Sequence, residues 1–114
     1  VKGALRVDAY AGEDRFAVHK LDLHQCIADL CTRLTPQINL LDCTRVLLTR
    51  GPKGPGQVKV LDRIVAGTDQ VAVDSFAAGY FGLKPADLGY LVAAREMGLG
   101  KTDLGAIRVK EIAV

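Results

Sequence analysis

Apolar residues recur at helical spacing between residues 22 and 35. Four of them lie four, three and four positions apart, on one face of a helix: Leu23, Ile27, Leu30 and Leu34. Asp22 stands where an N-cap can bind the free amides of a first turn. Thr35-Pro36 closes the pattern, because the residue before a proline avoids helical geometry. The pattern therefore predicts a helix over residues 22–35.

Two extended runs follow this helix. Residues 38–47 are almost continuously aliphatic or β-branched, which predicts a strand buried on both faces. Residues 49–57 contain three glycines and two prolines and are predicted to form a loop. Residues 58–65 resume the strand pattern. The two runs therefore predict two strands joined by one glycine-proline loop.

A helix over residues 70–81 is predicted next. Asp69 is well placed as its N-cap, and Gly82 as its glycine C-cap. Four of its residues are small, which predicts that something packs very close to it: Ala72, Ala77, Ala78 and Gly79.

The last third of the chain predicts one more helix and a strand. Pro85 suits the first position of a helix, which then ends at Gly98 or Gly100. Residues 101–105 are predicted to form a turn and residues 106–114 a strand.

The predicted order is helix-strand-strand-helix-helix-strand, which indicates an α/β fold with a mixed sheet layered with helices. Residues 1–20 add little: residues 1–10 are interpreted as strand or loop, and residues 11–14 as a turn. We expect residues 1–114 to form a single domain.

Composition and charge disfavour two classes of partner. The chain has 114 residues, of which 49% are hydrophobic, so one domain with a real core is expected. A net charge of +2 and an aromatic content of 5% are too low to indicate a nucleic-acid interface. No apolar run approaches the roughly 18 residues of a membrane span.

The cysteines predict a reducing compartment. Cys26, Cys31 and Cys43 are an odd number, and the N-terminal stretch lacks the apolar core of a signal peptide. Together these features predict a cytoplasmic location. Cys26 and Cys31 would lie about 140° apart on a helix, so structural thiols are expected rather than a zinc or cluster site. The chain begins with Val1, which predicts a fragment of a longer protein.

The glycine-proline loop is the first candidate binding element. Four basic residues and no acidic one lie between Cys43 and Leu61: Arg45, Arg50, Lys53 and Lys59. Glycines let backbone amides approach an anion, and basic side chains add charge. The sequence RGPKGPG nevertheless matches neither the P-loop nor the dinucleotide fingerprint, and its prolines remove two amides. Two interpretations stay open: a ligand-binding loop or a rigid surface turn.

Three aspartates stand in apolar sequence. We interpret Asp69 as a helix cap. Asp42 lies inside a predicted strand and Asp74 inside the small-residue helix, where a carboxylate needs partners or a function. Either carboxylate is suited to hold a hard cation or to exchange protons. The alternative for both is a hydrogen bond that ties a loop amide or an arginine to the core.

The ordered combination of these segments resembles a known family. It comprises a strand carrying Asp42, a Gly-Pro-x-Gly loop, the stretches VAGTDQVAVDSFAAGYFGL and KPADLGYLVAAREMGLG, and a closing strand. Over residues 21–109 the chain resembles the C-terminal half of domain-of-unknown-function family 362, most specifically over residues 66–74. Two departures are Gln70, where proline is common, and the doubled Gly-Pro of the loop.

The resemblance implies a larger protein. Family members are longer, with an N-terminal part that precedes this half, and many carry or neighbour ferredoxin-type iron–sulfur motifs. The chain contains no such motif. We therefore expect no cofactor within it and an iron–sulfur cluster elsewhere in the full-length protein. The family has no established activity, so the resemblance supplies a fold and candidate residues but no reaction.

Two functional hypotheses follow. In the first, the chain forms one wall of an anion- or metal-assisted ligand-binding cleft, completed by the missing N-terminal part or a partner chain. The residues expected to face a small anionic ligand are Asp42, Arg50, Gly51, Lys53, Gly54, Gly56 and Asp74. In the second, the chain is a non-catalytic interaction or homo-oligomerisation domain, whose helix around Ala77 and Gly79 packs against a partner. No nucleophile–base pair is recognisable, so the sequence assigns no catalytic residues.

Overall fold

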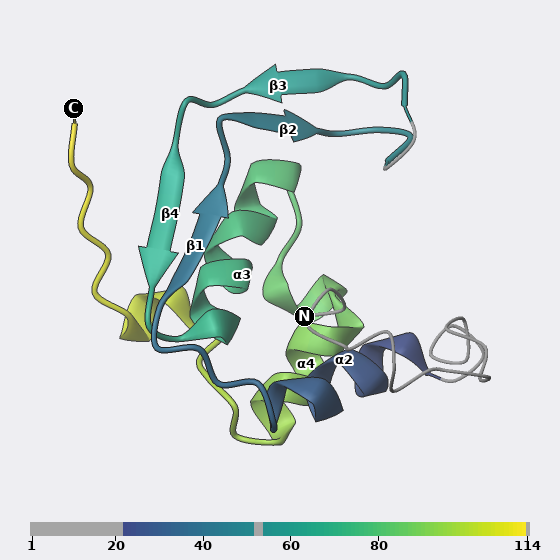
Figure 1. Cartoon of the computed structure of the whole chain (residues 1–114), viewed down its shortest axis with the longest axis vertical. Helices are drawn as coiled ribbons and strands as arrows, with labels where there is room; N and C mark the ends of the chain where they lie inside the picture. Colours follow the sequence, from purple (N-terminus) through teal and green to yellow (C-terminus); the bar gives the residue numbers. More distant parts are fainter. Residues whose placement is uncertain (1–21, 52–53, 114) are drawn as a thin grey trace, which may run out of the picture.

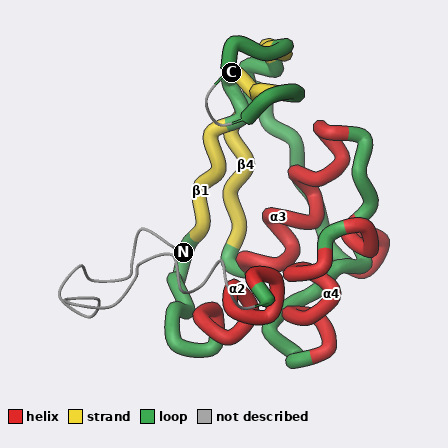
Figure 2. The backbone as a smooth tube through the Cα atoms, turned by 90° about the vertical axis from the view of Figure 1, so that its right-hand side faces the viewer, coloured by secondary structure: helices red, strands yellow, loops and turns green. Residues whose placement is uncertain are grey.

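The computed structural model describes residues 22–51 and 54–113. A long β-ribbon bends at its middle, and helix α3 lies between this ribbon and the helices α2 and α4 (Figure 1). Figure 2 shows the same arrangement from the side, with the strands β1 and β4 in one layer and the helices in another. The predicted α/β class is therefore confirmed. No helix in the described ranges combines the length and apolar character that a membrane crossing requires.

Helix α2 (Leu23–Cys31) is the first predicted helix, and its N-cap is confirmed. The Oδ1 atom of Asp22 accepts hydrogen bonds from the amides two and three residues further on, at 3.0 and 3.2 Å. The helix ends earlier than predicted, at Cys31. There the Thr32 hydroxyl donates a 2.6 Å hydrogen bond to the Asp29 carbonyl, which is the kind of local bond that competes with helix continuation.

The β-ribbon has two arms, each an antiparallel pair. In the first arm, β1 (Asn39–Asp42) pairs with β4 (Ile64–Gly67). In the second arm, β2 (Arg45–Leu47) pairs with β3 (Val58–Val60), and residues 48–57 join them at the tip. Each predicted strand is thus present but divided in two.

A bulge at the corner explains this division. Residues 43–44 on one side face residues 61–63 on the other, so one side has an extra residue. The Thr44 carbonyl accepts hydrogen bonds from both Leu61, at 2.9 Å, and Asp62, at 3.2 Å. Asp62 has a φ of 48°. An extra residue in one strand bends a ribbon, and here it separates the two arms.

Helix α3 (Gln70–Ala78) is the central helix. A Cβ at Gly67 of β4 would lie 2.7 Å from the Val73 side chain, so a glycine is needed where the helix meets the sheet. Most of the helix is already buried within the chain: Val71, Ala72, Val73, Ser75, Ala77 and Ala78. The helix therefore does not depend on a partner chain for its burial. A 3₁₀ turn (Gly79–Phe81) continues it to Gly82, whose φ of 71° confirms the predicted C-cap.

Helix α4 (Gly89–Glu96) follows a 3₁₀ turn (Pro85–Asp87), and the helical segment stops at Gly98, which has a φ of 71°. Four buried residues join the three helices into one core: Ala28, Val71, Leu91 and Ala94. Two of the four are alanines, so the helices approach one another closely.

The C-terminal segment, residues 107–113, is extended but is not a strand. The strand predicted over residues 106–114 is therefore wrong for the described residues. After a 3₁₀ turn (Leu104–Ala106), the segment runs back along β4 in the opposite direction (Figure 1). No backbone hydrogen bond joins this described segment to β4. The sequence is strand-like, but the segment pairs with none of the described strands.

Candidate functional site

Asp74 has the most unusual environment of the predicted site residues. It lies on α3 and is half-buried. Burial raises the pKa of its carboxyl group above the usual value, and a hydrogen bond with the Tyr90 side chain of α4 offsets part of that rise. The carboxyl group therefore holds its proton more tightly than an exposed aspartate does.

Tyr90 completes the pair from the first turn of α4. Burial, followed by the negative charge of Asp74 and the hydrogen bond to it, raises the pKa of Tyr90 to about 12. Ionised Tyr90 beside ionised Asp74 would place two negative charges in a partly desolvated site. Burial and charge repulsion both oppose this ionisation. The Tyr90 hydroxyl is therefore a permanent hydrogen-bond donor at neutral pH.

Helix α2 adds an imidazole beside Tyr90 and a thiol near Asp74. Burial, and then the negative charge of Asp74, raise the pKa of the Cys31 thiol. The His24 ring stacks on the Tyr90 ring, with centroids 6.4 Å apart and planes at 11°. A Cβ at Gly89 would lie 2.9 Å from the His24 ring, so this glycine permits the stacking. We refer to His24, Cys31, Asp74 and Tyr90 as the Asp74 cluster.

The Asp74 cluster combines groups suited to proton exchange. A carboxyl group with a raised pKa gives up or takes a proton closer to neutral pH than an exposed one. Next to it on α3, the Ser75 hydroxyl is 1% exposed and has no hydrogen-bond partner among the described residues. No signal in the sequence links Tyr90 to Asp74, because their contact depends on how α3 packs against α4.

Asp42 lies elsewhere, at the corner of the ribbon. It is exposed, and its Oδ1 atom accepts hydrogen bonds from the Thr44 amide at 2.8 Å and the Thr44 hydroxyl at 2.6 Å. These two bonds, the side-chain one first, lower the pKa of the Asp42 carboxyl. This local tie corresponds to the hydrogen-bonding interpretation of Asp42.

The glycine-proline loop forms the tip of the ribbon. Arg50 has a φ of 55° and Gly54 a φ of 44°, and the Gly54 amide donates to the Arg50 carbonyl at 2.9 Å. At Gly56 a Cβ would collide with the Thr49 carbonyl, so the tip is a tightly built turn. Gly51 lies in the same turn, and Lys53 lies outside the described residues.

The loop and the two aspartates are not brought together. β2 and its flanking residues separate Asp42 from the tip by on the order of 15 Å, at about 3.3 Å per residue. Asp74 interacts with Tyr90 of α4, whereas Asp42 bonds to Thr44 at the ribbon corner. Ligand binding by the loop therefore stays a prediction that rests on the loop alone.

Asp69 confirms its interpretation as a cap and has a second role. One carboxylate oxygen accepts from the Ala72 amide at 3.0 Å and the other from the Lys101 amide at 2.9 Å. A Cβ at Gly100 would overlap the Asp69 carboxylate, so a glycine is required there. The carboxylate thus fastens the start of α3 to the segment after α4.

The three cysteines lie at different places in the described structure. Cys31 belongs to the helical core, Cys43 is buried at the ribbon corner, and Cys26 is half-buried on α2. Within the described ranges, no group of three or more histidine, cysteine or acidic side chains could hold a metal ion.

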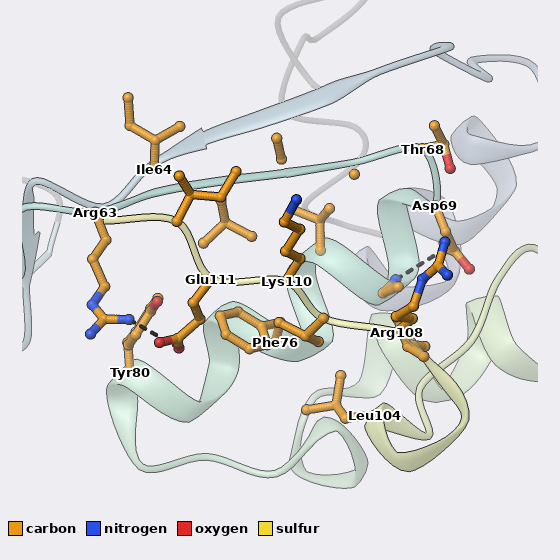
Figure 3. A pocket seen from close by; sticks show the side chains of 18 of the residues that line it. Arg63, Ile64, Thr68, Asp69, Phe76, Tyr80, Leu104, Arg108, Lys110 and Glu111 are labelled. Carbon is orange, nitrogen blue, oxygen red and sulfur yellow. Dashed lines mark hydrogen bonds and ion pairs between the residues drawn. The ribbon is translucent and has the colours of Figure 1, made fainter. Parts of the chain in front are cut away.

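A pocket of about 1090 Å³ lies between β4, α3 and the C-terminal segment (Figure 3). Residues 61–69 and 107–113 form its long sides. Side chains of α3 and the turn after it form its floor: Ala72, Val73, Phe76 and Tyr80. None of the described site residues predicted from the sequence lines this pocket. The sequence contained no sign of it, because the pocket depends on where the C-terminal segment lies.

The sequence model of one family, described as "Domain of unknown function (DUF362)", matches residues 5–79. This range is more than half of the chain and includes the ribbon and α3. The part of the expected resemblance over residues 80–109 lies outside the matched range. No curated protein and no solved structure matches the chain.

Proposed function

Because the chain belongs to the DUF362 family, we propose that it forms one wall of a ligand-binding site centred on the Asp74 cluster. The missing N-terminal part of the protein or a partner chain completes the site. The proposal places the centre of binding at the junction of α2, α3 and α4 instead of at the ribbon corner and tip.

The observation that carries the proposal is the pair formed by Asp74 and Tyr90. The pKa of the carboxyl is raised by burial, and the pKa of the hydroxyl is raised to about 12. Shifted titration of neighbouring groups marks candidate functional sites, because catalysis and binding need such groups. The buried Ser75 hydroxyl, which has no partner among the described residues, supports a site that other residues complete.

A small anion with hydrogen-bond acceptors, such as a carboxylate or phosphate, is the proposed ligand. On binding, the single O–H of Tyr90 turns from Asp74 to the anion and donates its hydrogen bond there. A negative charge beside Asp74 raises the pKa of that carboxyl further, so Asp74 takes up a proton and becomes a second donor. Binding of the anion is therefore coupled to proton uptake.

The test is calorimetric titration of the full-length protein with phosphate and acetate in buffers of different ionisation enthalpy. The wild-type protein is expected to take up a proton on binding, whereas Asp74→Asn binds without proton uptake. Tyr90→Phe should weaken binding about tenfold, the loss of one hydrogen bond to a charged group.

Asp42→Asn is the matched control and should leave both affinity and proton uptake unchanged, because Asp42 is exposed at the ribbon corner. If neither anion binds the wild-type protein, or if Asp74→Asn takes up protons like the wild type, the proposal is wrong.

From the family we also propose that an iron–sulfur centre is associated with the full-length protein. The cysteines of this chain do not fit a cluster, because Cys43 lies in the ribbon, whereas Cys26 and Cys31 lie five residues apart on α2. Iron and acid-labile sulfide should be measured after anaerobic purification, and a variant with all three cysteines changed to serine should retain both. A cytoplasmic location, where the thiols stay reduced, belongs to the same proposal.

An assembly role is the second candidate, favoured by the outer face of the β1–β4 sheet. Three large apolar side chains are exposed there or next to it: Ile38 at 62%, Leu40 at 69% and Ile64 at 72%. Analytical ultracentrifugation of the wild-type protein and of Leu40→Glu/Ile64→Lys tests this role. It predicts an oligomer that the double variant dissociates, and a wild-type monomer at all concentrations would contradict it.

A further inference from the structure

The pocket beside β4 has the form of a gap that one additional β-strand would fill. Its long sides, residues 61–69 and 107–113, are both runs of consecutive residues, and the second runs opposite to β4 (Figure 1). No backbone hydrogen bond joins these two described segments. Extended backbone edges that lack partners are templates for an added strand.

β4 presents backbone groups to this pocket. The Cys43 amide donates to the Arg63 carbonyl at 2.9 Å, which sets the alternation of the ladder between β1 and β4. By this alternation Val65 bonds to β1, whereas the N–H and C=O groups of Ile64 and Ala66 point away from β1, toward the pocket. These groups have no backbone partner among the described residues.

The floor of the pocket selects apolar side chains. Successive side chains of a strand point to opposite faces, so every second residue of an added strand would face α3. The floor there consists of Ala72, Val73 and the Phe76 ring, which packs edge-on against the Tyr80 ring at 5.8 Å. An added strand therefore needs apolar residues at alternate positions.

The charged side chains of the pocket determine which residues an added strand should carry between its apolar positions. Arg63 is paired with Glu111 at 3.3 Å, and both oxygens of Asp69 accept from amides. Arg108 and Lys110 form no ion pair with another described residue, and both extend from the C-terminal segment toward β4 (Figure 3).

The remaining acid that lines the pocket is Asp62, at the corner end of β4. Opposite charges directly across a strand pair attract. The positions beside Arg108 and Lys110 therefore favour acidic residues.

We infer that this pocket binds a β-strand of a partner polypeptide in which apolar and acidic residues alternate. The strand pairs with β4 on one edge and with residues 107–113 on the other, and it lies over α3. This inference goes beyond the proposed anion site, because the pocket and Asp74 lie on different faces of α3.

The test uses the full-length protein and a blocked peptide of about seven alternating glutamate and valine residues, the length of the C-terminal side of the pocket. Binding is measured by fluorescence anisotropy and by amide hydrogen exchange. The peptide is expected to bind and to protect the amides of Ile64 and Ala66. A peptide with lysine in place of glutamate is expected not to bind.

Three variants separate strand pairing from general electrostatic attraction. Arg108→Glu/Lys110→Glu should weaken binding about tenfold, the effect of two cross-strand charge pairs. Lys84→Glu/Arg95→Glu is the matched control: it makes the same charge change at exposed sites outside the pocket and should leave affinity unchanged. Ala66→Pro, which removes an outward N–H, should also abolish the protection of the Ile64 amide.

Three results would overturn the inference. The first is a glutamate peptide that fails to bind, or that binds without protecting Ile64 and Ala66. The second is protection of these amides in the free protein at every concentration, which would assign the pocket to the protein's own residues. The third is protection that rises with protein concentration alone, which would assign the pocket to a second copy of the chain.

Discussion

The helical layer and the β-ribbon hold their aspartates by different means. In the helical layer, Asp69 bonds to the Lys101 amide far along the chain, and Asp74 meets Tyr90 of another helix. In the ribbon, the carboxylate of Asp42 is bonded to Thr44, two residues away. Similar apolar sequence surrounds all three, so neighbours in sequence do not decide whether a carboxylate supports tertiary structure. Packing between distant segments decides it.

The largest expected effect tests the contact between Gly100 and Asp69. In Gly100→Ala the new Cβ would lie 2.7 Å from the Val71 Cβ and overlap the Asp69 carboxylate, so the segment after α4 must move. We expect the free energy of unfolding to fall by about 3 kcal/mol, measured by urea denaturation.

Gly79→Ala is the control, because a Cβ there meets no atom within 4 Å and the backbone is helical at φ −60°. It should be neutral or stabilise by about 0.5–1 kcal/mol. Equal losses in the two variants would contradict the tight contact at Gly100.

A smaller effect is expected from removing the Asp69 carboxylate. Asp69→Ala loses the cap of α3 and the bond to the Lys101 amide, a loss of about 2 kcal/mol in the free energy of unfolding. Asp42→Ala loses bonds to one exposed neighbour and should be clearly milder in the same denaturation series. If the two variants were equally destabilised, the contrast between the two regions would fail.

The pH dependence of stability tests the environment of Asp74. Its pKa in the folded state lies above the usual 3.8, so between these two values the folded protein binds more protons than the unfolded chain. The stability contribution of Asp74 is therefore lost as the pH rises from about 4 through the folded pKa.

Asp74→Asn removes this titration but keeps an acceptor for Tyr90. The free energy of unfolding of the variant, relative to wild type, should therefore increase from about pH 4 upward and then level off. Urea denaturation between about pH 3 and 8 measures it, and a difference that does not change with pH would contradict burial of the carboxyl.

The contact between Asp74 and Tyr90 also predicts a tyrosine ionisation at alkaline pH. Tyr90 has a pKa of about 12 in the folded protein, so ultraviolet absorbance should show a tyrosine that ionises near this pH. Tyr90→Phe should remove that step, and Asp74→Asn should move it down toward 10.0, the usual tyrosine value. A step that stays at the same pH in Asp74→Asn would show that the Asp74 charge does not act on Tyr90.

The smallest expected effect on stability comes from the ion pair between Arg63 and Glu111, and it separates distance along the chain from burial. Arg63 and Glu111 are far apart in sequence, yet both are exposed, at 52% and 72% of the side chain. Arg63→Ala should therefore cost less than about 0.5 kcal/mol, and added salt should reduce the cost further. A larger loss of stability in thermal denaturation would mean that a contact between distant segments stabilises the protein even when both side chains are exposed.

The features that the sequence predicted well are local ones. The Asp22 and Asp69 caps and the Gly82 terminus depend on a few neighbouring residues and are all confirmed. The helices and the two divided strands follow from side-chain period, which is also local.

The features that the sequence did not predict depend on what lies opposite a segment. Residues 38–47 were expected to be covered on both faces, but Leu40 is 69% exposed, because nothing in the described structure covers the outer face. Residues 107–113 have a strand-like pattern but form no backbone hydrogen bond with a described strand. The contact between Asp74 and Tyr90 required the packing angle of two helices, which no local pattern specifies.

The bond from the Lys101 amide to Asp69 also closes a loop in the chain. It fastens together the two ends of residues 69–101, the segment that contains α3 and α4. A segment closed at its base and packed on itself opens as one cooperative unit rather than by fraying from its ends. Amides of α3 and α4 should therefore exchange with solvent deuterium with a common opening free energy, while those at the tip of the ribbon exchange earlier and independently.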